Sequence, residues 1–246
     1  MLHKKFIVIE GIDGCGKGTV MNAIIDFLKR NKIRFLDLRE RKEDLASSSG
    51  LTKECSAILT CEPTHHGTGR ELREKILRNL ENYTARQVAE KFTEDRNILY
   101  EKTVIPALKK GMVVFQDRSV ISTFVYQVNE AVKNNEKFST GDIEKMNAVA
   151  MENPPGLVIV QNVSPEAAHS RLSKRKEKQD NTEFEKIEFL KRNSEGYRKG
   201  EWRRLFAEKG TDIKDLDCNA GIDAVKQNAV KIIEDYLGKN GISLVR

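Results

Sequence analysis

The sequence has few cysteines and no long hydrophobic run. Its four cysteines form no C-x-x-C pair and lack the dense spacing of disulfide-rich proteins. This pattern favours a reducing compartment, so we expect a cytoplasmic protein. The first residues lack the apolar segment of a secretory signal, and no stretch approaches membrane-spanning length. Secreted disulfide scaffolds and integral membrane proteins are therefore not expected.

Acidic residues are outnumbered. The chain has 37 acidic and 43 basic residues, a formal net charge of +6, which attracts polyanions. Nucleotides with several phosphates satisfy this charge as well as nucleic acid does, so charge alone does not choose between them. No linker, internal repeat or low-complexity tract interrupts the 246 residues. Residues 1–246 are predicted to form one domain with one core.

Residues 6–19 read F-I-V-I-E-G-I-D-G-C-G-K-G-T, a short apolar run that ends in a glycine-rich turn. The spacing fits the phosphate-binding pattern G-x-x-x-x-G-K, with a predicted strand before it and a predicted helix after it. Backbone N–H groups in such a turn form an anion cradle, and the lysine reaches the β- and γ-phosphates. The alternative is an ordinary glycine turn before a helix, which does not account for the lysine. The residues predicted to bind ATP are Gly11, Ile12, Asp13, Gly14, Cys15, Gly16, Lys17, Gly18 and Thr19.

One position of this loop departs from the usual pattern. Gly18 follows the lysine where Ser or Thr normally contributes a Mg²⁺-binding hydroxyl, and Thr19 comes one place later. Motor ATPases and small GTPases depend on that hydroxyl, whereas G-K-G-T is common in adenylate kinases. The departure favours a small phosphotransferase.

Predicted strands alternate with predicted helices along the chain. The strand candidates are residues 6–9, 35–38, 57–60, 112–115 and 157–163. This alternation predicts an α/β fold with a doubly wound, five-stranded parallel sheet and helices on both faces. Helices are expected at 19–28, 69–80, 84–108 and 223–237, with one from about Ile121, another through Met151, and one beginning with Pro165 behind a Ser164 cap. The polar, serine-rich residues 39–56 are predicted to be an inserted surface loop.

The apolar run 112–115 leads to Gln116, Asp117 and Arg118 at the carboxyl end of a predicted strand. Open α/β sheets bind ligands at that edge. Asp117 is therefore a candidate for Mg²⁺, directly or through water, and Arg118 for gripping a phosphate with two nitrogens. A surface salt bridge after the strand is the alternative.

Phe92 and Arg96 lie four residues apart on one face of a predicted helix. Together they would form a base-stacking platform with a donor that reaches the base edge. A core aromatic residue beside a surface arginine explains the same spacing.

Two further groups of residues have competing interpretations. The basic run from Arg171 to Lys178 is either a solvated helix end, which charge patterning alone favours, or part of a lid over residues 171–183 that neutralises the transferring phosphoryl group. Cys55, Cys61, His65 and His66 are close in sequence, but their spacing matches no usual zinc pattern, and a ligand loop is favoured there.

Taken together, these segments resemble the thymidylate kinase family of P-loop nucleoside monophosphate kinases over nearly the whole chain. Glu62-Pro63-Thr64, followed by Leu72-Arg73, is similar to that family's E-P segment in the form seen in archaeal members. Residues 92–96 read F-T-E-D-R and match its base-binding segment. Residues 117–127 resemble its motif D-R-Y-x-x-S-x-x-A-Y-Q and are the most specific match.

The resemblance implies transfer of the γ-phosphoryl group of ATP to dTMP, with Mg²⁺ as cofactor, in a P-loop NTPase fold with a lid. It also implies a homodimer, with neither membrane nor nucleic acid as partner. Lys17, Arg118 and Arg175 would be catalytic, Arg175 from the lid with Arg171 as second choice. The implied substrate-binding residues are Asp13, Arg73, Phe92, Arg96, Arg118, Ser122, Tyr126 and Gln127.

Four positions depart from the family pattern: Cys61, Ser119, Asn162 and Asn181 stand where arginine, an aromatic residue, aspartate and arginine are frequent. These departures bear on the nucleotide more than on the reaction. Two alternatives stay open. One is another P-loop kinase acting on a different nucleotide or a nucleoside. The other is a basic nucleotide- or nucleic-acid-binding module that has lost activity.

Overall fold

The computed structural model describes residues 2–40, 55–174 and 186–244. Six parallel strands form one sheet in the order β2-β3-β4-β1-β5-β6. The strands are β1 (Phe6–Glu10), β2 (Phe35–Asp37), β3 (Ala57–Cys61), β4 (Val113–Asp117), β5 (Leu157–Asn162) and β6 (Asp212–Asp217). The predicted α/β class and parallel sheet are confirmed, but the predicted number of five strands is wrong.

The strand that the prediction missed is β6, at one edge of the sheet. Its sequence D-I-K-D-L-D carries four charged residues, and only Leu216 is buried among its six residues. Asp and Lys are poor strand formers in isolation. The strand forms because β5 pairs with it along its whole length, from Leu157 opposite Asp212 to Asn162 opposite Asp217.

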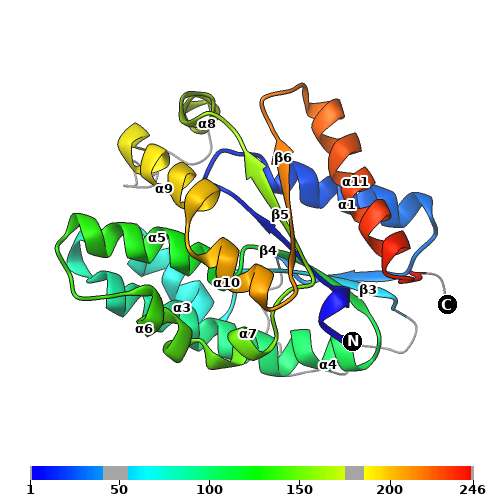
Figure 1. The fold of residues 1–246 in the computed structure, drawn as a ribbon, viewed down its shortest axis with the longest axis horizontal. Helices are drawn as coiled ribbons and strands as arrows, with labels where there is room; N and C mark the ends of the chain where they lie inside the picture. Colours follow the sequence, from blue (N-terminus) through cyan, green and yellow to red (C-terminus); the bar gives the residue numbers. More distant parts are fainter. Residues whose placement is uncertain (1, 41–54, 175–185, 245–246) are drawn as a thin grey trace.

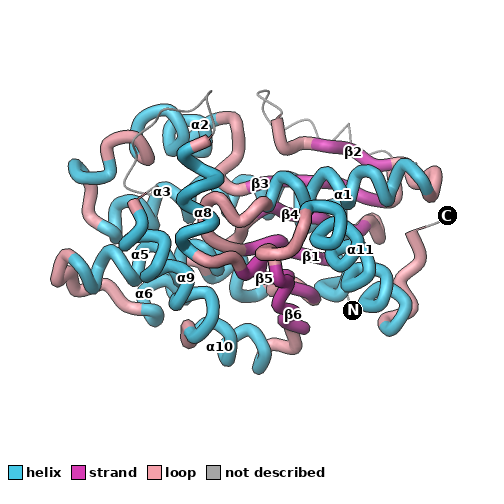
Figure 2. The backbone as a smooth tube through the Cα atoms, turned by 90° about the horizontal axis from the view of Figure 1, so that it is seen from above, coloured by secondary structure: helices cyan, strands magenta, loops and turns pink. Residues whose placement is uncertain are grey.

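The inner strands are apolar because helices cover both faces of the sheet. All residues of β1 and β3 are buried. Helices α1 (Lys17–Arg30) and α11 (Ile222–Lys239) pack together on one face, and α3 (Ala85–Leu99) and α5 (Val120–Lys133) lie on the other (Figures 1 and 2). Strands β3, β4 and β1 are neighbours and parallel, so their carboxyl ends lie side by side at one edge of the sheet, between these two helical layers.

The remaining helices and helical turns follow in chain order. They are η1 (Leu2–Lys5), α2 (Gly67–Glu71), η3 (Leu72–Ile76), η4 (Leu80–Asn82), η5 (Tyr100–Val104), α4 (Ile105–Lys109), α6 (Thr140–Met146), α7 (Ala148–Glu152), α8 (Pro165–Ser173), α9 (Ile187–Lys199) and α10 (Trp202–Glu208). Helices α9 and α10 were not predicted.

The predicted helix over 84–108 is confirmed as a continuous helical segment. Thr84 caps it in a capping box with Gln87, and the segment runs through α3, η5 and α4 to Lys109. The predicted start of α8 is also confirmed: the Ser164 hydroxyl accepts from the N–H of Ala167, and Pro165 occupies the first turn. By contrast, the predicted helix over 69–80 begins and ends earlier than expected, because α2 and the π-helical turn η3 together run from Gly67 to Ile76.

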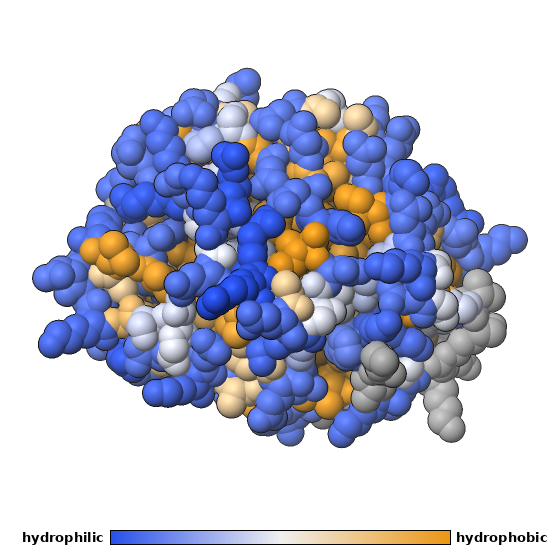
Figure 3. Space-filling model, in the orientation of Figure 1, coloured by the Kyte–Doolittle hydropathy of each residue, from blue (hydrophilic) through white to orange (hydrophobic). Residues whose placement is uncertain are grey.

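The surface shown in Figure 3 is mostly hydrophilic, with small hydrophobic patches between charged residues. No helix of the described residues has the length and apolar character needed to cross a membrane. Residues 41–54 of the predicted insertion and residues 175–183 of the predicted lid lie outside the described residues.

Candidate active site

The glycine-rich turn joins β1 to α1 and contains backbone that only glycine adopts readily. Gly14 and Gly16 have φ angles of 78° and 103°, in the region that side chains disfavour. A Cβ on Gly14 would also lie 2.5 Å from the carbonyl oxygen of Ala168 on α8. Lys17 begins α1, and its Nζ donates to the carbonyl oxygens of Gly11 and Ile12 at 3.0 Å each. The turn and its lysine thus form one tightly packed unit against α8.

A polar network supports this turn from below. The side chain of Gln161, buried on β5, donates to Cys218 Sγ at 3.3 Å and lies 3.9 Å from Cys15 Sγ. Arg171 on α8 donates to the carbonyl oxygens of Cys218 at 2.8 Å and of Cys15 at 3.4 Å. These donations hold the guanidinium of Arg171, the second choice for the catalytic cation, on the backbone.

Arg118 lies at the end of β4 and faces the glycine-rich turn. Its φ angle is 67°, and its N–H donates to Ile9 of the neighbouring strand at 2.9 Å. Its guanidinium pairs with Asp13 at 2.5 Å and lies 5.1 Å from the centre of the Tyr126 ring. Tyr126 donates to the other carboxylate oxygen of Asp13 at 2.9 Å. Burial would raise the pKa of Asp13, but the charges of Arg118 and Lys17 hold it below its ordinary value.

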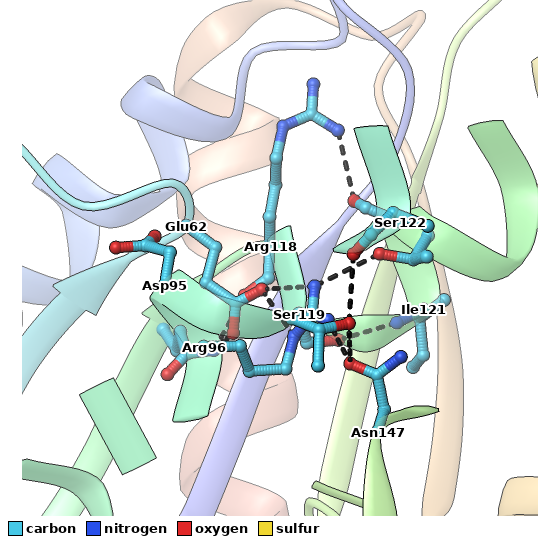
Figure 4. A network of polar contacts seen from close by, with 12 residues as sticks. Glu62, Asp95, Arg96, Arg118, Ser119, Ile121, Ser122 and Asn147 are labelled. Carbon is cyan, nitrogen blue, oxygen red and sulfur yellow. Dashed lines mark hydrogen bonds and ion pairs between the residues drawn. The ribbon is translucent and has the colours of Figure 1, made fainter. Parts of the chain in front are cut away.

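Glu10 is a buried carboxylate at the end of β1. It accepts from the hydroxyls of Ser119, Ser122 and Tyr197, each at 2.8 Å. Burial raises the pKa of Glu10, opposed by the charge of Arg118 and by these three donors. Figure 4 shows the guanidinium of Arg118 beside Ser122, to whose Oγ its Nη1 donates at 3.2 Å.

Glu62 and Arg96 form a fully buried ion pair (Figure 4), at 2.8 Å. Arg96 also donates to Asn147 at 2.5 Å and to Thr123 at 3.1 Å, and Gln116 donates to Glu62 at 3.0 Å. Burial raises the pKa of Glu62 to about 7, and Arg96 opposes that rise. The side chain of Arg96 is 1% exposed, so it lies within the wall behind the pocket.

A cavity of about 430 Å³ lies above these networks. Twelve predicted site residues line it: Asp13, Gly14, Gly16, Lys17, Gly18, Arg73, Phe92, Asp117, Arg118, Ser122, Tyr126 and Gln127. Five others do not line it: Gly11, Ile12, Cys15, Thr19 and Arg96. Arg175 lies outside the described residues. The roles assigned to all these residues stay predictions.

The model of the thymidylate kinase family matches residues 46–228. A thymidylate kinase of Prochlorococcus marinus (strain MIT 9301) is 34% identical over 202 residues, which cover 79% of this chain and 82% of that protein. This chain belongs to the thymidylate kinase family. A second family member, the thymidylate kinase of Caldanaerobacter subterraneus subsp. tengcongensis, is 30% identical over 96% of this chain and 98% of its own length. Both are bacterial proteins, although residues 62–64 suggested archaeal members.

Asp117 fits a magnesium ion. Its Oδ1 atom is buried without a hydrogen-bond partner among the described residues, and the residue lines the cavity beside Asp13 and Lys17. Carboxylate oxygen is a ligand type that Mg²⁺ prefers. This unpaired oxygen makes Asp117 the candidate ligand for the ion in this thymidylate kinase family member.

Among the described residues, which include Cys55, Cys61, His65 and His66, no group of three or more such side chains could hold a metal ion. Burial raises the pKa of Cys61 to about 12. Its thiol donates to the carbonyl oxygen of Arg39 at 3.2 Å. Arg73 donates to Cys61 at 3.6 Å and to the carbonyl oxygens of Pro63 and Thr64. Of these residues, Cys61, Pro63 and Arg73 line the pocket.

The surroundings of Phe92 agree with both roles considered from the sequence, a core aromatic residue and a base-stacking platform. It is half-buried against the cluster of Leu72, Ile76 and Val88, and it also lines the cavity. Its ring is therefore a core contact on one side and is available to a ligand on the other.

Removing Arg96 should destabilise the fold far more than removing an exposed arginine of the same helix. Arg96→Ala leaves Glu62 buried without its cation, which should lower the free energy of unfolding by about 3–5 kcal/mol. Arg86→Ala is the matched control, because Arg86 pairs with Asp142 at the surface and such pairs contribute about 0–1 kcal/mol. Denaturant unfolding measures both. Equal losses would mean that the Glu62–Arg96 pair does not hold the wall together.

Proposed function

We propose that the protein transfers the γ-phosphoryl group of ATP to dTMP, giving dTDP and ADP. One observation carries the proposal: the side chain of Asp13, from the glycine-rich turn, is bonded to both Arg118 and Tyr126 within a single cavity. The predicted donor loop and the predicted acceptor side chains are therefore in contact. Membership of the thymidylate kinase family supports the choice of substrates.

The reaction needs positioning and charge neutralisation more than proton transfer. An oxygen of the acceptor phosphate attacks the γ-phosphorus, and the bond from that phosphorus to the bridging oxygen of ADP breaks. The attacking oxygen is already anionic, so no strong base is required. Lys17 and the loop N–H groups would bind the donor phosphates, while Arg118 would hold the acceptor phosphate with its planar fork of donors.

Mg²⁺ is the proposed cofactor, with Asp117 as ligand, directly or through water. When bound, the ion would neutralise charge on the donor phosphates. Arg175 is proposed as the cation that completes this neutralisation from the lid. Arg171 is a weaker candidate than its sequence position suggested, because its guanidinium donates to the Cys15 and Cys218 carbonyls.

The base and sugar contacts are proposed from the residues on the opposite side of the cavity. Phe92 would stack on the pyrimidine, with Ser122 and Gln127 beside it. Tyr126 would lie under the sugar and disfavour a 2′-hydroxyl. Arg96 was assigned a contact with the base oxygen, and its burial favours a supporting role behind Thr123 instead. We also propose that the protein is cytoplasmic and forms a homodimer. Sedimentation of the purified protein would test the dimer.

A coupled assay of ADP release tests the function across all ribonucleoside and deoxyribonucleoside monophosphates with Mg-ATP. We expect the highest kcat/KM with dTMP. A higher value with another monophosphate, or with a nucleoside, would indicate a different P-loop kinase. No ADP release above the ATP-only background with any acceptor would indicate a non-catalytic nucleotide-binding protein.

Lys17→Ala should nearly abolish turnover without unfolding the protein. The ammonium contributes most in the transition state, and loss of such a contact costs about 100-fold or more in kcat. Lys29→Ala, on the exposed face of the same helix α1, should leave turnover unchanged. If folded Lys17→Ala works within a few-fold of the original protein, the donor-site assignment is wrong.

Phe92→Ala should raise the KM for dTMP far more than the KM for ATP, because stacking serves only the acceptor base. Loss of one stacked ring corresponds to about 1–3 kcal/mol, as for bases stacked on aromatic residues in nucleic-acid-binding proteins. Phe92→Leu separates the two roles of this residue, since it keeps an apolar side chain against Leu72 and Val88 but removes the ring. If Phe92→Leu restores the KM for dTMP, Phe92 acts only as a core residue.

A further inference from the structure

Tyr197 joins a distant helix to the predicted acceptor site. It lies on α9, is 2% exposed, and donates through its hydroxyl to Glu10 at 2.8 Å. The same hydroxyl oxygen is 2.9 Å from Ser122 Oγ. Ser122 and Glu10 are 75 and 187 residues away in the sequence. One hydroxyl therefore connects α9 with the end of β1 and the first turn of α5.

These contacts limit the directions in which the Ser122 hydroxyl can point. Ser122 has one proton to donate, and Glu10 Oε2 accepts it at 2.8 Å. The lone pairs of the same oxygen are then available to Arg118 Nη1, at 3.2 Å. Tyr197 also donates to Glu10 Oε2 and approaches Ser122. The order of contacts is thus Tyr197, then Glu10 and Ser122, then the guanidinium of Arg118.

The ring of Tyr197 has a separate role in packing. It contacts the rings of Tyr126 and Trp202 edge to face, with centroids 6.2 and 6.5 Å apart. Helix α9 in turn packs against α5 and α8, the helices that hold Ser122 and Arg171. The ring accounts for the packing of α9, so the hydroxyl can be removed without removing that packing.

We propose that Tyr197 is a positioning residue, whose hydroxyl orients Ser122 and through it the guanidinium of Arg118 that grips the acceptor phosphate. A purely structural role would affect both substrates, whereas this positioning role affects mainly the acceptor. A misplaced guanidinium weakens the acceptor phosphate contact and slows transfer, since transfer depends steeply on alignment. The glycine-rich turn keeps its contacts with Gln161 and Arg171, which do not involve Arg118, so we expect ATP binding to change far less than dTMP binding. The inference rests on the proposed phosphoryl transfer.

Tyr197→Phe tests the proposal, because it removes only the hydroxyl. We expect kcat/KM for dTMP to fall about tenfold, as for the loss of a hydrogen bond to a charged group, with the KM for ATP within about twofold of the original, since the loop contacts are kept. Tyr236→Phe is the matched control. Tyr236 is also buried, its hydroxyl donates to the carbonyl oxygen of Lys4 at 3.0 Å, and it lies on α11 away from the cavity. It should lose comparable stability and no activity.

A double variant tests whether the Tyr197 hydroxyl acts through Ser122. If the hydroxyl acts through Ser122, Tyr197→Phe made in a Ser122→Ala background should cause little further loss for dTMP. Losses that multiply in the double variant would overturn this route. The proposal would also be overturned if Tyr197→Phe behaves like Tyr236→Phe, or if it raises the KM values of ATP and dTMP equally. Failure of the original protein to phosphorylate dTMP would instead contradict the proposed function, and the two results are distinguishable in one assay.

Discussion

The ion pair between Asp13 and Arg118 is the interaction on which the pocket depends. Asp13 belongs to the turn after β1, and Arg118 follows β4. The two strands are neighbours and parallel in the sheet, so the segments that follow them leave the sheet at the same edge. The left-handed backbone at Arg118 and the bond from its N–H to Ile9 turn the side chain towards the glycine-rich loop. The pair therefore connects the predicted donor and acceptor sites at 2.5 Å.

Buried charges lie behind this pair, and each is compensated. Glu10 has three hydroxyl donors, and Glu62 has Arg96 and Gln116. A buried carboxylate without such partners would be costly. With them, the network rigidifies the wall behind the cavity, because the donors come from α3, β4, α5 and α9 at once. Positioning of the side chains that line the pocket is thus a property of several distant segments.

Local patterns predicted the parts of the site that are continuous in sequence. The loop at residues 11–19 and the strand leading to Asp117 and Arg118 each carry their candidate residues within a dozen positions, so local sequence was enough to predict them. Contacts between distant segments had no local signal. Nothing near Tyr197 indicates that its hydroxyl reaches Glu10, and nothing near Arg171 indicates that it donates to Cys218. Strand β6 was missed for the same reason, because its charged residues form a strand only beside β5. Glu10 did carry a local signal, because it is the one charged residue in the otherwise apolar strand β1.

We propose that Asp13 and Arg118 act as one unit in binding the acceptor. A double-mutant cycle with Asp13→Asn and Arg118→Lys tests it most directly, with calorimetric titration of dTMP into the protein without ATP. We expect each single variant to weaken dTMP binding by about tenfold or more, as for a close, partly buried charge pair. The double variant should lose little beyond the larger single loss, since contacting residues couple. Losses that multiply in the double variant would show two independent contacts and contradict the claim.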